Sequence, residues 1–106
     1  MPLRRLSLAF AVVAWLATTA GADDQQIVQR NKAFSVRDTV IATGASLTFV
    51  NADTVTHNVF SLTKGQEFEI RTQRPGQSQT ITFAKSGVAL VECAIHPSMQ
   101  LRVVVK

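Results

Sequence analysis

The chain has 106 residues, carries 11 Lys and Arg against 7 Asp and Glu, and contains a single Cys. That length is enough for one domain. The net charge of +4 is mild and the basic residues are scattered, which excludes the basic face of a nucleic-acid-binding protein. One Cys also excludes an internal disulfide, so Cys93 is free, joined to another chain or held by a metal.

The first 22 residues have the pattern of an export signal. Arg4 and Arg5 precede an apolar run, residues 6–20, that is too short to span a bilayer comfortably, and small residues follow at 20–22. We predict a cleavable signal peptide at residues 1–22, export to the periplasm, and one mature domain at residues 23–106 without a membrane span. The general secretory route is favoured over the twin-arginine route, which the paired arginines also suggest, because the residues after them match its signal poorly. The alternative is a retained membrane-anchoring helix. Removing Arg4 and Arg5 leaves nine basic against seven acidic residues, a net charge of +2.

The mature segment has the pattern of short strands separated by turns, and it contains no helix-period segment of useful length. A first strand is expected at residues 27–31, with Phe34 and Val36 continuing its apolar side. Alternating or β-branched runs bounded by turn signals predict further strands at residues 39–42, 46–51, 56–60, 68–71, 79–83, 88–93 and 101–105. About seven or eight such strands predict an all-β fold, either an antiparallel sandwich or a small barrel. Its core is expected to contain Phe34, Phe49, Phe68 and Phe83.

One segment near the C-terminus, Cys93-Ala94-Ile95-His96-Pro97-Ser98-Met99, places a thiolate, an imidazole and a thioether three residues apart. With His57 upstream, these are the only sulfur and imidazole side chains after residue 22. The strand predicted at 88–93 delivers Cys93 at its end. A sandwich gathers its connecting loops at two ends, so one end can collect His57 and the three later residues.

This donor set suits copper better than other common metals. Two His and one Cys in a plane, with a weak axial Met, form the blue-copper arrangement. A structural zinc site requires four Cys or His ligands, iron–sulfur clusters require several Cys, and calcium and magnesium require clusters of oxygen atoms. We therefore predict a mononuclear copper site of the electron-transfer type, with the ligands His57, Cys93, His96 and Met99.

The motif Cys93-x-x-His96-Pro97-x-Met99, with His57-Asn58-Val59 upstream, resembles the small cupredoxins. These are type 1 blue copper proteins of the amicyanin, pseudoazurin and plastocyanin kind, and the resemblance covers most of the mature chain. It implies a cupredoxin-like Greek-key β-sandwich, one type 1 copper ion and one-electron transfer between periplasmic redox proteins.

The resemblance also implies a role for each residue of the site. His57, Cys93 and His96 would be the equatorial ligands of copper and Met99 the axial one. Asn58 would tie the two ligand loops together and help to hold the Cys93 sulfur. The ring edge of His96 would reach the surface and serve as the exit for the electron.

We expect an exported, monomeric electron carrier, not an enzyme, whose partners are redox proteins such as a c-type cytochrome or a dehydrogenase. An alternative is a periplasmic protein that delivers or sequesters copper, because Cu(I) favours the same donors. A third hypothesis makes Cys93 and His96 a nucleophile and its base, but the sequence offers no clear group to orient the ring. Taken singly, each residue has a plainer interpretation, Cys93 as a small buried side chain and Asn58 as an ordinary turn residue.

Overall fold

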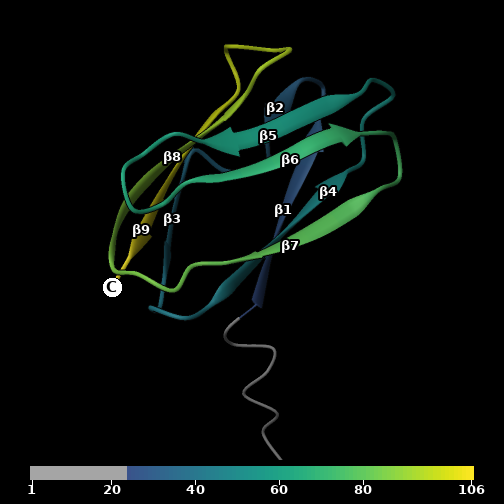
Figure 1. The fold of residues 1–106 in the computed structure, drawn as a ribbon. Helices are drawn as coiled ribbons and strands as arrows, with labels where there is room; N and C mark the ends of the chain where they lie inside the picture. Colours follow the sequence, from purple (N-terminus) through teal and green to yellow (C-terminus); the bar gives the residue numbers. More distant parts are fainter. Residues whose placement is uncertain (1–23) are drawn as a thin grey trace, which may run out of the picture.

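The computed structural model describes residues 24–106, which form two β-sheets packed against each other (Figure 1). The predicted signal peptide lies outside the described residues. The strands, in chain order, are β1 (Asp24–Arg30), β2 (Ala33–Phe34), β3 (Asp38–Ile41), β4 (Ser46–Asn51), β5 (His57–Ser61), β6 (Phe68–Gln73), β7 (Ser78–Thr82), β8 (Gly87–Cys93) and β9 (Gln100–Val105). Within residues 24–106, no helix has the length and apolar character needed to cross a membrane.

The two sheets contain parallel as well as antiparallel neighbours. One sheet has the order β2-β1-β4-β7 and the other β3-β9-β8-β5-β6. Strand β1 is parallel to β4, and β3 is parallel to β9. The all-β sandwich is confirmed, and the antiparallel pairing expected from the sequence holds for all strand neighbours except these two pairs. Hairpins join only some of the neighbours, and strands that return after a long connection can pair in the same direction.

The strand predicted at residues 27–31, whose apolar side Phe34 and Val36 were expected to continue, is followed by a tight turn and a second strand, β2. Asn31 and Lys32 both have left-handed backbone conformations, with φ of 53° and 55°. Two such residues in a row reverse the chain as in a type I′ hairpin turn, and Gln29 then pairs with Phe34. The described part of the chain therefore has nine strands where about seven or eight were expected.

The core lies between the sheets and contains a row of aromatic rings. Alternation along β4 turns Leu47 and Phe49 inward, and both are fully buried. The row runs from Phe34 through Phe49 and Phe68 to Phe83, with ring centroids 6.3, 5.9 and 5.8 Å apart. Phe34, Phe49 and Phe83 are buried and Phe68 is partly buried against them, so the predicted aromatic core is confirmed.

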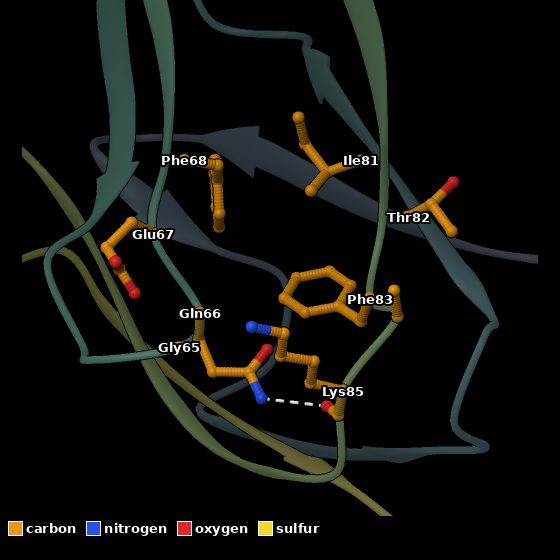
Figure 2. A pocket seen from close by; sticks show the side chains of 9 residues that line it. Gly65, Gln66, Glu67, Phe68, Ile81, Thr82, Phe83 and Lys85 are labelled. Atoms are coloured by element: carbon orange, nitrogen blue, oxygen red, sulfur yellow. Dashed lines mark hydrogen bonds between the residues drawn. The ribbon is translucent and has the colours of Figure 1, made fainter.

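A shallow hollow of about 160 Å³ lies where β6 begins and β7 ends (Figure 2). Phe68, Ile81 and Phe83 form its apolar part, and Gln66 Nε2 donates a hydrogen bond to the Lys85 carbonyl across it at 2.7 Å (Figure 2). Neither Cys nor His lines it. The register of β4 places Ser46 beside Thr82 at this end, so the other end of β4 is the one that leads toward His57.

Candidate metal centre

The structure brings three of the four predicted ligands, His57, Cys93 and His96, together from two strands and one loop. His57 is the first residue of β5 and Cys93 is the last residue of β8. These strands are antiparallel neighbours, with Val59 opposite Cys93. His96 and Met99 lie in the connection from β8 to β9, where the Met99 amide donates to the His96 carbonyl at 2.9 Å. That bond closes a turn whose second residue is a proline, a preferred residue at this place because its φ is fixed.

Three donor atoms face one another at this end of the sandwich. The Cys93 Sγ lies 3.7 Å from His57 Nδ1 and 3.8 Å from His96 Nδ1, and the two Nδ1 atoms are 3.1 Å apart. Metal–nitrogen bonds of about 2.0 Å and metal–sulfur bonds of about 2.3 Å, as at zinc, would separate the donors of one trigonal ion by roughly 3.5–3.8 Å. The side chains are therefore already spaced closely enough to hold one ion.

Burial distinguishes His96 from the other residues of the set. His57 is fully buried, Cys93 and Met99 are each 1% exposed, and His96 is half-buried. Met99 belongs to the same buried cluster as Cys93. Next to His96, the side chain of Ile95 is 54% exposed. The imidazole of His96 is thus the part of the set nearest to solvent.

Asn58 contacts the sulfur through its backbone. Its amide donates to Cys93 Sγ at 3.4 Å, and its carbonyl accepts from the Ala94 amide at 3.1 Å. These two bonds connect the beginning of β5 to the end of β8. Ala94 has no polar side chain, so the connection depends on main-chain groups.

Asp53 was missed in the sequence, where residues 51–54 have the composition of an ordinary polar loop. Its Oδ2 lies 3.0 Å from Nε2 of His57, on the ring edge opposite the one that faces Cys93. Oδ2 also accepts from the Lys32 amide at 2.8 Å, and Oδ1 accepts from the Thr54 amide at 2.9 Å. An acidic residue four positions before a ligand histidine was the only available signal.

Two groups at the centre have lowered pKa values. The Lys32 amide is the main cause that brings the pKa of Asp53 from 3.8 to about 2; partial burial opposes it, and the Thr54 amide and the His57 ring add to it. Burial is the main cause that lowers the pKa of His96; the neighbouring His57 and Lys32 act in the same direction, and the carboxylate of Asp53 opposes them. Both shifts favour an ionised Asp53 and a neutral His96, whose ring nitrogen can bind a metal.

A buried amide network lies beside the histidine. Gln73 pairs with His57 across β6 and β5. Its Oε1 accepts from Gln29 Nε2 at 2.6 Å, and its Nε2 donates to the Phe49 carbonyl at 2.9 Å, which joins the two sheets. Asn51 Nδ2 donates to the carbonyls of Val55 and Gln73 at 2.9 and 2.8 Å. Strand β5 therefore begins, at His57, next to this hydrogen-bonded amide network.

The donor set fits copper chemically. A thiolate and imidazoles are borderline or soft ligands, and with a thioether nearby they form the set of blue-copper sites. His57, Cys93 and His96 are a group of three metal-ligating side chains whose donor atoms all lie within 4.8 Å of one another. Three such ligands are one fewer than a closed structural zinc site requires.

Comparison with known proteins agrees with this chemistry. Residues 22–106 match the family described as copper binding proteins, plastocyanin/azurin family. Amicyanin from Paracoccus versutus (Thiobacillus versutus) is 26% identical, with a TM-score of 0.71, over 80% of this chain and 83% of that one. A purple cupredoxin from Nitrosopumilus maritimus is 25% identical, with a TM-score of 0.69, over 78% of this chain and 100% of that one.

A more distant likeness shows the fold alone. The copper-containing nitrite reductase of Thermus scotoductus is 22% identical, with a TM-score of 0.68, over 77% of this chain but only 22% of that one. A search of curated proteins finds no match. Because the family match spans all of the described residues, the chain belongs to the plastocyanin/azurin family of copper-binding proteins as a small cupredoxin, and its cofactor is one type 1 copper ion.

Proposed function

We propose that this protein is a periplasmic one-electron carrier in which His57, Cys93, His96 and Met99 would hold one copper ion. The observation that carries the proposal is the meeting of two imidazole nitrogens and a thiolate sulfur within 4.8 Å, in a chain that belongs to a copper-binding family. Met99 is buried and lies three residues after His96 in the same connection from β8 to β9, which supports its place in the set.

The bound ion would supply a one-electron couple, and the chain's own residues would hold and insulate it. Strand pairing holds His57 and Cys93, and the turn at residues 96–99 holds the other two. The Asn58 amide donates to the sulfur and partly offsets its negative charge. His96 is the half-buried ligand beside the exposed Ile95, so we propose this edge as the place where electrons enter and leave.

The electronic spectrum of the loaded protein tests the ligand set. Cu(II) added to the mature protein should give an intense band near about 600 nm, because charge moves from thiolate to copper at a trigonal site. Cys93→Ala should abolish the band, whereas Ser98→Ala, in the same loop but exposed, should keep it. A protein that takes up copper yet stays colourless in its isolated and oxidised forms contradicts the proposal.

Export is part of the proposal and has its own test. We propose that residues 1–22 are removed as a signal peptide and that the mature domain begins at Asp23; the family match, which starts at residue 22, supports this boundary. Intact-mass measurement on protein from the periplasmic fraction should give the mass of residues 23–106. Recovery of the full-length chain from the membrane fraction would favour a retained anchor.

The electron-carrier and copper-delivery hypotheses predict different relative rates of electron transfer and copper transfer. Assembled and largely buried donors favour holding copper through redox cycles over handing it to another protein. We therefore expect the reduced, monomeric protein to pass electrons to a c-type cytochrome, or to accept them from a dehydrogenase, faster than it loses copper to a metal-free acceptor. Rapid copper transfer with slow electron transfer would favour a protein that delivers or sequesters copper.

A further inference from the structure

Three N–H groups converge on the carboxylate of Asp53, whose side chain is only 8% exposed. The Lys32 amide and the His57 ring both contact Oδ2, at 2.8 and 3.0 Å, and the Thr54 amide donates to Oδ1 at 2.9 Å. An ionised carboxylate can only accept hydrogen bonds. The contact with His57 therefore places the ring proton on Nε2 and leaves the lone pair of Nδ1 facing Cys93 and His96.

The position of this carboxylate is determined by two separate turns. Lys32 presents its amide because Asn31 and Lys32 are both left-handed, a conformation that residues other than glycine adopt rarely and at a cost. The Asp53 amide donates to Asn51 Oδ1 at 2.9 Å, which shapes the loop after β4. The turn between β1 and β2 and the loop after β4 thus both hold Asp53 against the far edge of the histidine ring.

We propose that Asp53 is a positioning residue that selects Nδ1 of His57 as the metal donor and, through its negative charge, lowers the reduction potential of the copper. The proposal rests on the proposed role of His57 as a ligand. Hydrogen bonding of a ligand histidine to a carboxylate fixes its tautomer and raises its basicity. A negative charge behind the ring stabilises Cu(II) more than Cu(I), because Cu(II) carries the larger positive charge. A neutral acceptor would fix the tautomer without this second effect.

A purely structural role makes different predictions. If Asp53 only stabilises the turn between β1 and β2, its replacement changes the free energy of unfolding. It then changes neither the reduction potential of the copper nor the tautomer of His57. The spectroscopic and redox measurements therefore separate the two roles, and stability alone does not.

The variant Asp53→Asn separates charge from geometry. The His57 and Lys32 bonds share one oxygen, so the amide oxygen of asparagine can keep both. The bond to Thr54 is lost, but Thr54 is exposed and water can replace it. We expect Asp53→Asn to keep the intense band near about 600 nm and to raise the potential at neutral pH. Asp38→Asn is the matched control, because Asp38 is exposed and forms only a 3.5 Å contact with Arg102.

The variant Asp53→Ala removes both the charge and the acceptor. We expect it to weaken copper binding by about 10–100-fold, the usual effect of removing a partner of a ligand histidine. Imidazole nitrogen NMR of the metal-free protein supplies a readout that needs no copper. The wild type and Asp53→Asn should hold the His57 proton on Nε2, and Asp53→Ala should lose that preference.

The outcomes that overturn the proposal differ from those that overturn the electron-carrier function. A wild-type His57 protonated on Nδ1, an Asp53→Ala variant that keeps the Nε2 proton, or equal potential shifts in Asp53→Asn and Asp38→Asn each refute the role of Asp53. Absence of the blue band in the wild type refutes the copper function while the metal-free NMR result still decides the tautomer. A raised potential confined to Asp53→Asn, with an Nε2 proton in the wild type, supports the role of Asp53.

Discussion

Two buried glutamine amides join the sheets beside His57, and replacing Gln73 measures what they contribute to stability. Gln73 is 2% exposed and Gln29 is fully buried. Gln73→Met keeps the length of the side chain but removes the acceptor for Gln29 Nε2 and the donor to the Phe49 carbonyl. Among the described residues no donor reaches Gln29 Oε1, so the Gln29 amide would lose its only partner.

The expected loss follows from the two bonds. A buried polar group left without a partner costs about 1–3 kcal/mol, and loss of the bond to the Phe49 carbonyl, which has a second lone pair, adds about 1 kcal/mol. We therefore expect Gln73→Met to lower the free energy of unfolding by about 2–4 kcal/mol. For a domain of this length the total is about 4–12 kcal/mol, so the loss is a large fraction of it.

A double variant tests whether the unpartnered Gln29 amide causes the loss of stability. Adding Gln29→Met to Gln73→Met removes the stranded amide, so the double variant should be more stable than Gln73→Met alone by about 1–2 kcal/mol. The assay is urea unfolding of the metal-free protein followed by circular dichroism, since bound copper would add its own binding energy. Gln79→Met, at an exposed position of β7, is the control and should change stability by less than about 0.5 kcal/mol. A double variant less stable than the Gln73→Met single variant would refute the argument.

Three further predictions concern the axial ligand, the core and acid. Met99→Gln should keep a coloured copper site but lower its potential in a redox titration, because a harder donor stabilises Cu(II). Leu47→Ala, at a fully buried position, should cost about 2–5 kcal/mol in urea unfolding. Leu62→Ala, at a position that is 78% exposed, should cost less than about 0.5 kcal/mol, and similar losses at the two sites would contradict the packing. The pKa of Asp53 falls from 3.8 to about 2 on folding. The free energy of unfolding of the metal-free wild type should therefore exceed that of Asp53→Asn by the largest amount above pH 3.8, and this difference should shrink as the pH falls toward about 2. A pH-independent difference in urea unfolding would contradict that shift.

Local patterns in the sequence were sufficient for most strands but not for their partners. Alternation predicted β4 to the residue and ended β8 at Cys93. It could not show that β1 lies parallel to β4, since the pairing of Asp24 with Ser46 depends on how the intervening chain folds. The break at Lys32 was missed because lysine is not a residue that usually signals a left-handed turn.

The sequence likewise predicted the donors of the candidate site but not the residue that contacts them from the loop after β4. The sequence named His57 and the three residues Cys93, His96 and Met99 of one loop as donors, but only the pairing of β5 with β8 shows how His57 comes to lie beside Cys93. Asp53 could not be recognised, because its carboxylate meets the histidine ring only after the loop between β4 and β5 has folded. A contact of that kind depends on tertiary geometry, which spacing alone does not determine.

The supports of the donor set explain why this fold suits electron transfer. Sheet pairing holds Cys93 and His57, the Asn58 amide contacts the sulfur, and Asp53 holds the far edge of the His57 ring. None of these contacts uses the metal, so the chain itself constrains the donors before any ion is bound. Ligands that move little when copper gains or loses an electron keep the reorganisation cost of transfer small. In the proposed function, His96, the half-buried residue of the set, would give a redox partner a short path to donors that are otherwise buried.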